Sequence, residues 1–259
     1  MEISIVQAIL IALWSGFCLA GMLLGIYTNR CLVMATGVGI ILGRPDLGLA
    51  MGALGELAYL GYGVSQGGSI PPNAMGPGIV GAIMVITAGV TTDEALALTY
   101  PFAVGVQFLL TFVYTFATTL TPLSIKALEQ KNFKKFSFFA NTTVWVFFIA
   151  GALFGLMSAL AAPLLQKIIE FIPDWLRNGL GVAGGMLPAV GFAMILNMMG
   201  KKETIPFVLI GYVLFAYLGL PTMAIAITAG AIALIVFFNQ GKGGAAAAEE
   251  EEVVFEDGI

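Results

Sequence analysis

Glu56 is the residue whose type and surroundings point most directly to chemistry. It lies in the apolar run AMGALGELAYLGYG at 50–63, away from any charged loop. Placing an ionised carboxylate inside a membrane costs about 2.5–3.5 kcal/mol on insertion scales, so an acid in such a run is a functional candidate. It can accept hydrogen bonds from two sugar hydroxyl groups, or it can carry a proton. The structural alternative is an ion pair with Arg30 or Arg44.

A run rich in glycine and proline follows at 61–78. It contains six glycines and three prolines and cannot form an uninterrupted helix. Its side chains are neutral hydrogen-bonding groups, at Ser65, Gln66, Ser69 and Asn73. No cluster of arginine or lysine accompanies them, so the run favours an uncharged, polyhydroxylated solute over a multiply anionic one. We predict a substrate site made by Glu56, Gln66, Ser69 and Asn73; the alternative for this run is a simple linking turn.

Missing residue types exclude several chemistries. The chain has no histidine, so no imidazole can act as a base, a metal ligand or a phosphate carrier. Cys18 and Cys31 lie in apolar stretches without CxxC spacing, which indicates buried small side chains rather than a metal site or thiol chemistry. No Walker A lysine motif for ATP is present. We therefore predict no catalytic residue, no metal ligand and no cofactor, and a chain that is not catalytic alone.

The composition decides which class of protein positions these residues. Of the 259 residues, 59% are hydrophobic and 10% are charged, against about 45–50% and about 25% in ordinary soluble domains. A soluble protein of this length cannot bury so much apolar surface. The sequence therefore predicts an integral protein of the lipid bilayer and disfavours a nucleic-acid binder or a secreted disulfide scaffold.

A membrane-spanning helix needs about 20 mostly apolar residues, and the chain offers a series of such segments. Clean spans are predicted at 3–27, 95–121, 138–163, 180–200, 205–219 and 222–239. Three further apolar stretches are short and interrupted by glycine and proline, at 31–43, 46–64 and 75–91. Broken backbone at membrane depth is tolerated where it lines a cavity, and discontinuous helices form substrate sites in transporters. The predicted fold is an all-α polytopic helical bundle with broken or re-entrant helices, and its site is expected within 44–78.

Local signals mark three further segments. The pattern TTDEALAL at 91–98 predicts a helix that begins with a capping box. Residues 164–178 predict an amphipathic interfacial helix with Trp175 as an aromatic anchor, and a plain loop is the alternative. Gly184, Gly185 and Pro188 are expected to kink a later helix and to permit its close packing against a neighbour.

Positive charge predicts the orientation of the chain in the membrane. The 122–137 loop holds four lysines against one acid, at Lys126, Lys131, Lys134, Lys135 and Glu129. We therefore place this loop in the cytoplasm, and the later spans bring the C-terminus to the same side. Six of the 15 acidic residues lie in the tail from 249 onward. We divide the chain into a membrane-embedded transport domain at 1–240 and an acidic cytoplasmic tail at 241–259, which is either a solubilising tail or a docking peptide.

Taken in order, these motifs resemble the membrane subunit IIC of the mannose–fructose–sorbose family of bacterial sugar phosphotransferase systems. The resemblance extends over nearly the whole chain. It is carried by MEISIVQAIL at the start, Arg30 with the apolar run to GIILG, Gly48, GELAYLG at 55–61, Pro72–Asn73, and WLRNGLGVAGGMLPAVGFAMILNMM at 175–199. The chain departs from the family at Cys31, where proline is common, and at Arg44, where aspartate is frequent. The ending Asp-Gly-Ile looks most like the branch that handles N-acetylgalactosamine.

The resemblance implies a division of labour between subunits in the bacterial cytoplasmic membrane. It implies a homologous-looking membrane partner, IID, and soluble IIA and IIB subunits that carry phosphate on histidine, which this chain lacks. It also implies an elevator-like motion within a trimer of IIC–IID pairs. It places Glu56 and Asn73 at the sugar site, whereas Gln66 and Ser69 are included for their chemistry alone.

The predicted function is therefore sugar translocation in a phosphoenolpyruvate-dependent phosphotransferase system. A hexose or amino sugar of the mannose, sorbose or N-acetylgalactosamine type binds near the membrane midplane and moves inward. A phosphorylated IIB subunit docks at the cytoplasmic face near the basic 126–135 loop, and the sugar is phosphorylated there. One alternative is a proton-coupled secondary sugar transporter that uses Glu56 as proton carrier. Another is a structural membrane subunit whose partner forms the site.

Arg30 has two open interpretations, as the end of the first helix at an interface or as the partner of Glu56.

Overall fold

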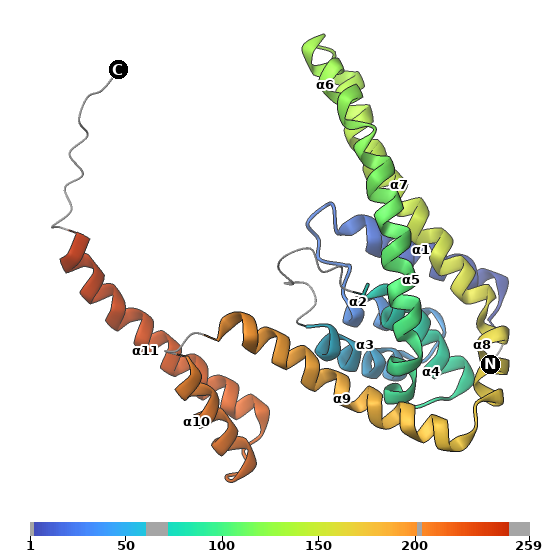
Figure 1. Ribbon diagram of the computed structural model, residues 1–259. Coiled ribbons are helices and arrows are strands. Elements are labelled where there is room, and N and C mark those ends of the chain that lie inside the picture. Colours follow the sequence, from blue (N-terminus) through green and yellow to red (C-terminus); the bar gives the residue numbers. More distant parts are fainter. Residues whose placement is uncertain (1–2, 61–71, 201–203, 249–259) are drawn as a thin grey trace, which may run out of the picture. The chain divides into compact units, whose positions relative to one another are not determined.

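The protein is described by a computed structural model that covers residues 3–60, 72–200 and 204–248, with side chains to 238. Within these ranges the chain is helical and contains no strand. It divides into two compact units, Met1–Asn197 and Met198–Ile259. The helices are α1 (Ile5–Gly21), α2 (Cys31–Ile41), α3 (Pro45–Tyr59), the π-helical η2 (Gly76–Gly81), α4 (Ala82–Ala88), α5 (Thr92–Thr118), α6 (Thr121–Glu129), α7 (Phe133–Leu160), α8 (Ala162–Phe171), α9 (Asp174–Met199), α10 (Ile205–Ala216) and α11 (Thr222–Ala248) (Figure 1).

Three helical runs are long and apolar enough to cross a membrane among the described residues. They are Thr92–Glu129, Phe133–Leu160 and Asp174–Met199, and they match three of the predicted clean spans. Shorter apolar helices account for most of the rest. The all-helical, multi-pass architecture predicted from composition is therefore confirmed.

The first predicted span, 3–27, is too long at its end because α1 stops at Gly21. The Thr28 hydroxyl donates a hydrogen bond to the Cys18 carbonyl at 2.9 Å, and its side chain packs where a Cβ on Gly21 would stand. Tyr27 adopts a left-handed backbone with φ of 55°. The chain therefore folds back on the last turn of α1 instead of continuing as helix.

Helices α2 and α3 form a hairpin that is too short to cross a bilayer. α2 has 11 residues, which is roughly 16 Å of helix rise against about 30 Å of hydrocarbon. The hairpin turns at Gly43, whose φ is 75°. Its helices approach closely because Gly39 faces Gly48, and a Cβ on Gly39 would lie 2.8 Å from the Gly48 Cα atom. The short, interrupted helices predicted in this region are present.

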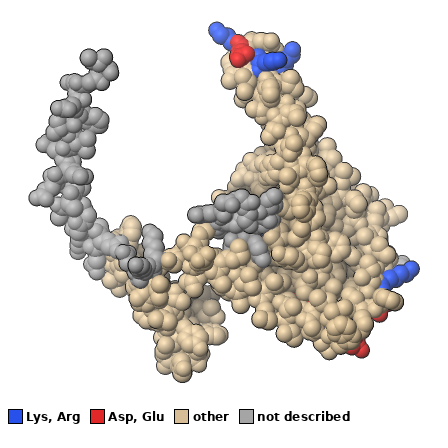
Figure 2. Space-filling model, in the orientation of Figure 1, with Lys and Arg blue, Asp and Glu red and all other residues tan. Residues whose placement is uncertain are grey.

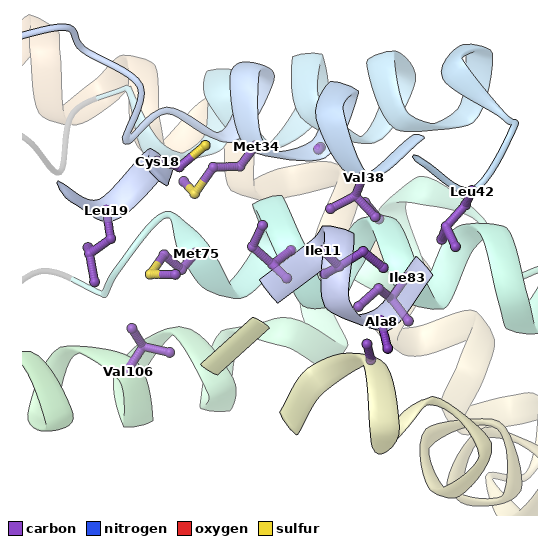
Figure 3. Close-up of a cluster of buried hydrophobic side chains, with 14 of the residues drawn as sticks. Ala8, Ile11, Cys18, Leu19, Met34, Val38, Leu42, Met75, Ile83 and Val106 are labelled. Atoms are coloured by element: carbon purple, nitrogen blue, oxygen red, sulfur yellow. The ribbon is translucent and has the colours of Figure 1, made fainter. Parts of the chain in front are cut away.

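The core of the first unit lies between these short helices and the long ones. Figure 3 shows Met34 and Val38 of α2 facing Met75 and Ile83, which flank and follow η2, with Ile11 of α1 beside them. All five side chains are fully buried. This cluster fixes α2 and η2 against each other, and both elements continue to the site described below.

Helix α1 packs along the second half of α7 through small residues. A Cβ on Gly151 would lie 2.8 Å from the Ser15 carbonyl oxygen, and one on Gly155 would lie 3.0 Å from the Ile11 carbonyl oxygen. This spacing of four residues lets two membrane helices approach at backbone distance.

The N-terminus of α5 has the predicted capping box. The Thr91 hydroxyl accepts a hydrogen bond from the Glu94 N–H at 3.3 Å, and the Glu94 carboxylate accepts one from the Thr91 N–H at 3.1 Å. The same carboxylate pairs with Arg177 of α9 at 3.4 Å. Helix α9 lies close here because Gly184 and Gly185 face Asp93, so the expectation of close packing at these glycines is confirmed.

The amphipathic helix predicted over 164–178 is divided into two helices. α8 ends at Phe171, and α9 begins at Asp174 and carries Trp175. Pro173 explains the break, because it pushes the preceding residue out of the helical region, and Ile172 has an extended ψ of 122°. The predicted continuity is therefore wrong, although the segment is helical and not a plain loop.

Helices α5, α6 and α7 form an arm that extends away from the other helices of this unit (Figure 1). The buried residues of α5 end at Leu110, and those of α7 begin at Phe147. We call residues 111–146 the arm. An edge-to-face ring contact between Tyr114 and Phe147, with centroids 4.8 Å apart, marks its base.

The second unit contains the hairpin of α10 and α11. Gly219, with φ of 60°, follows α10, and Pro221 precedes α11. α11 continues to Ala248 and is longer than the span predicted at 222–239. An apolar groove of about 360 Å³ lies between the two helices.

Candidate functional site

A polar pocket of about 240 Å³ opens in the first unit where several short elements meet. It lies at the start of α2, the end of α3, the residues that precede η2, and the middle of α5. Its polar lining comprises Asn29, Arg30, Glu56, Tyr59, Asn73 and Gln107, and Met22, Cys31, Pro72 and Ala74 complete the wall. The elements that supply these residues are far apart in sequence, so the pocket exists only in the folded chain.

Glu56 forms the charged side of the pocket and is held by two contacts. Its Oε1 atom pairs with Arg30 Nη1 at 3.1 Å, and its Oε2 atom accepts a hydrogen bond from the Leu32 N–H at 3.4 Å. Leu32 lies in the first turn of α2, whose N-cap residue makes no side-chain capping bond. A carboxylate is favourable at a helix N-terminus, so Glu56 of α3 caps α2. Each carboxylate oxygen has two lone pairs and keeps one acceptor position for a ligand.

The two arginines that sequence reasoning left open as partners of Glu56 have different roles. Arg30 pairs with Glu56 in the pocket. Arg44 instead pairs with its neighbour Asp46, with Nη2–Oδ2 and Nε–Oδ1 distances of 2.9 and 3.1 Å. The Arg44 hydrogen bonds lower the pKa of Asp46 at the exposed start of α3. The Arg44 pair is therefore local, and Arg30 is the charge partner of the pocket.

Asn73 is held by three hydrogen bonds on the opposite side of the pocket. Its N–H donates to the Ala103 carbonyl at 3.0 Å, and its Oδ1 atom accepts from the Met75 N–H at 2.9 Å. Its Nδ2 atom donates to Gln107 Oε1 at 3.4 Å. The two amides thus form a pair with N–H donors left over, since each amide nitrogen carries two hydrogens.

Asn29 lines the pocket, and its amide oxygen is buried. Its Nδ2 atom contacts the Met22 sulfur at 3.3 Å. Its Oδ1 atom is buried and has no hydrogen-bond partner among the described residues. A buried acceptor without a partner is costly.

Two of the four predicted site residues meet in this pocket, namely Glu56 and Asn73. Gln66 and Ser69 lie outside the described residues, so their positions stay predictions from sequence. Sequence reasoning missed Gln107 and Asn29 and left Arg30 undecided. The available signal for Gln107 was a single amide in the apolar run PFAVGVQFLL of a predicted span.

Helix α9 supports the wall that carries Glu56. A Cβ on Gly191 would lie 2.8 Å from the Ala58 carbonyl oxygen and closer still to the carbonyl oxygen of Leu57. These two residues follow Glu56 in the last turn of α3. The absence of a side chain at position 191 therefore lets α9 pack directly against the backbone of the site helix.

The arrangement is suited to binding a small neutral polyol. It offers carboxylate and amide acceptors, amide and guanidinium donors, and the aromatic ring of Tyr59 within one pocket. The volume is below the roughly 300–1,000 Å³ of pockets for drug-sized ligands, which suits a ligand of one sugar ring. Arg30 compensates the charge of Glu56, so the pocket is charged locally and neutral as a whole.

Comparison with known proteins adds independent information. Residues 5–235 match the family model described as the sorbose-specific IIC component of the phosphotransferase system. The chain is 31% identical over 216 residues to the N-acetylgalactosamine permease IIC component 1 of Escherichia coli K12, covering 83% of this chain and 80% of the relative. It is 32% identical to the sorbose-specific EIIC component of Klebsiella pneumoniae, covering 91% and 89%. It is 29% identical to the mannose-specific EIIC component of Escherichia coli K12, with the same coverage.

Two solved structures share the architecture. One, titled as the structure of a membrane protein, aligns with a TM-score of 0.84 and 27% identity over 91% of this chain and 96% of that chain. The mannose transporter ManYZ in complex with microcin E492 aligns with a TM-score of 0.59 and 28% identity over 92% and 96%. The three permeases above, which are named for three different sugars, have similar sequence identities to this chain, between 29% and 32%. The fold, the pocket and these matches together show that the chain belongs to the mannose/sorbose family of phosphotransferase-system IIC membrane permeases.

Proposed function

We propose that the chain binds a hexose or an amino sugar in the pocket between α2, α3 and α5, and moves it inward for phosphorylation by a partner subunit. The observation that carries the proposal is the convergence of Glu56, Asn73 and Gln107 on one pocket of monosaccharide size in a member of this family. Glu56 and the amides accept from and donate to the sugar hydroxyl groups, and Arg30 keeps the carboxylate in place.

The other components of the proposed cycle follow from the family. A membrane subunit IID pairs with this chain, and trimers of such pairs form the transporter. Soluble IIA and IIB subunits deliver phosphate, and this chain has no histidine to carry it. An elevator-like motion of the pocket brings the sugar to the cytoplasmic face, where the tail and the 122–137 loop are placed. The new phosphate charge then prevents the sugar from returning.

The contacts of Glu56 favour substrate binding over proton transport. Both of its oxygens already interact with protein groups, one with Arg30 and one with the Leu32 N–H. A proton carrier must lose and regain such partners in each cycle, whereas a sugar hydroxyl group only adds a hydrogen bond to those present. The secondary-transporter alternative therefore has less support than the phosphotransferase role.

Uptake of labelled sugars tests the proposal. Cells that express this chain with subunits IID, IIB and IIA are given labelled hexoses and amino sugars, and the internal label is analysed for phosphate. The test variant is Glu56→Gln. The matched control is Glu170→Gln, because Glu170 lies exposed on α8 away from the pocket.

We expect phosphorylated label that depends on Glu56. Hydrogen bonds to a charged group contribute about 1.5–3 kcal/mol each, so Glu56→Gln should weaken sugar binding by roughly 10- to 100-fold, at about 1.4 kcal/mol per factor of ten. Free label that collapses with the proton gradient would replace the proposal with a secondary transporter. Normal uptake by Glu56→Gln would place the site in a partner subunit.

A further inference from the structure

The tip of the α6–α7 hairpin is the most strongly charged surface among the described residues. Figure 2 shows blue side chains gathered at the end of the arm, with one red group among them. The tip comprises Lys126, Lys131, Lys134 and Lys135 with Glu129. All five are exposed, and none is in an ion pair within the described part of the chain. The surface has a net charge of +3 and no internal partner.

The backbone of the tip forms an ordered turn, which fixes the positions from which the lysine side chains extend. The Asn132 N–H donates to the Ala127 carbonyl at 2.9 Å, and the Lys131 N–H donates to the Leu128 carbonyl at 2.8 Å. This is the hydrogen-bond pattern of a Schellman helix end. Asn132 also caps α7, because its side chain accepts a hydrogen bond from the Lys135 N–H at 3.2 Å.

Lys131 occupies a position that glycine would fill with less strain. Its φ is 53°, in the left-handed region that costs a residue with a Cβ roughly 1–2 kcal/mol. The C′ position of a Schellman turn is usually glycine. The chain therefore places an exposed cation at a position where a helix turn alone would favour glycine.

The arm is long enough to carry its tip beyond the lipid headgroups from a pocket at the bilayer midplane. Lys126 follows Gln107 of the pocket by 19 residues, which is roughly 28 Å of helix at 1.5 Å per residue. Transporter sites lie near the bilayer midplane, and headgroups end about 20–22 Å from it. Lysines at that height face water, where a soluble protein can reach them.

We propose that this tip is the docking surface for the acidic face of a soluble, phosphorylated protein, the subunit that delivers phosphate to the sugar. The proposal rests on the proposed function and names the place of contact on this chain. Steering by a cluster of one sign of charge raises association rates by roughly 10- to 1,000-fold at low salt. The exposed Phe133, next to Lys134 in sequence, supplies an apolar contact.

The test measures association of purified phosphorylated IIB with the full chain, assembled with its membrane partner in phosphatidylcholine nanodiscs. Three variants carry the argument: Lys131→Glu with Lys134→Glu and Lys135→Glu together, Lys131→Gly alone, and Lys167→Glu as control. Lys167 is an exposed lysine of α8, outside the tip. Lys131→Gly keeps the turn and removes one charge, so its effect does not depend on misfolding. Sugar binding is measured on every preparation.

We expect the triple reversal to slow association at least about 10-fold at low ionic strength. We expect Lys131→Gly to slow association less and Lys167→Glu to leave it unchanged. The differences should shrink as salt rises, and sugar binding should be equal in all four proteins. Equal association of IIB with the triple variant and the unaltered chain would overturn the docking surface while leaving the proposed function intact. A change in binding only when anionic lipid is added would assign the tip to the membrane surface instead. Failure of IIB to bind the unaltered chain would overturn both proposals.

Discussion

The contact of α9 with the site helix predicts different effects on stability for the same substitution at two positions of one helix. Gly191 lies against the carbonyl oxygens of Leu57 and Ala58, whereas Gly179 has no atom within 4 Å of the place a Cβ would take. Both belong to α9. Gly191→Ala and Gly179→Ala therefore make the same change in chain entropy and helix propensity but differ in the space available for the new methyl group.

The magnitude follows from two terms. Replacing glycine by alanine inside a helix is favourable by about 1 kcal/mol at both positions. Overpacking a tight contact costs about 1–3 kcal/mol, and this term applies at Gly191 alone, because the atoms in the way are backbone carbonyls that cannot rotate aside. Gly179→Ala should therefore be neutral or stabilising. Gly191→Ala should be less stable than Gly179→Ala by about 1–3 kcal/mol.

Equilibrium unfolding in mixed detergent, followed by circular dichroism, measures this difference. Sugar affinity of the folded protein provides a second measurement, because Leu57 and Ala58 directly follow Glu56 and a shift of α9 displaces the site helix. Gly184→Ala separates the two effects, since its methyl group would meet the Asp93 carbonyl away from the pocket. It should lower stability and retain affinity. Equal stability of Gly191→Ala and Gly179→Ala would refute the close contact between α9 and α3.

The remaining predictions concern the pocket. Removing Arg30 alone with Arg30→Gln leaves the Glu56 charge uncompensated. The double variant with Glu56→Gln should therefore be more stable than the sum of the two single effects predicts, by about 0.5–3 kcal/mol in a double-mutant cycle of detergent unfolding. Strict additivity of the two effects would contradict the ion pair. Gln107→Leu should weaken sugar binding by roughly tenfold, which is the equivalent of one hydrogen bond. Isothermal titration measures this change, and an unchanged Kd would remove Gln107 from the site.

Much of the site could be predicted because its residues are conspicuous in their local context. Glu56 is an acid in an apolar run, and Asn73 lies in a run too rich in glycine and proline for helix. Both features are local, and the physical cost of burying such groups makes them candidates without any structure. The same reasoning located the capping box at Thr91, since it depends on two residues three positions apart.

Other parts of the site depend on contacts between distant segments. Arg30 had two possible partners for its charge, and only the fold brings it within 3.1 Å of Glu56. Gln107 is a single amide in a span, and its role becomes visible when the chain before η2 returns to α5 and Asn73 reaches it. The interruption of the helix predicted over 164–178 has a local cause instead. Pro173 forces Ile172 out of the helical backbone region, and the amphipathic pattern did not take this into account.

The sequence by itself determined that this is a multi-pass helical membrane protein, that it has no histidine to carry phosphate, and which family it resembles. These conclusions rest on composition, on missing residue types and on ordered motifs, none of which requires knowledge of contacts. The tertiary structure decided which polar groups share a pocket, which arginine compensates Glu56, and that four lysines stand together at the end of an arm. Those facts depend on how short helices pack through glycines, and packing between residues far apart in the chain is a property of the folded molecule alone.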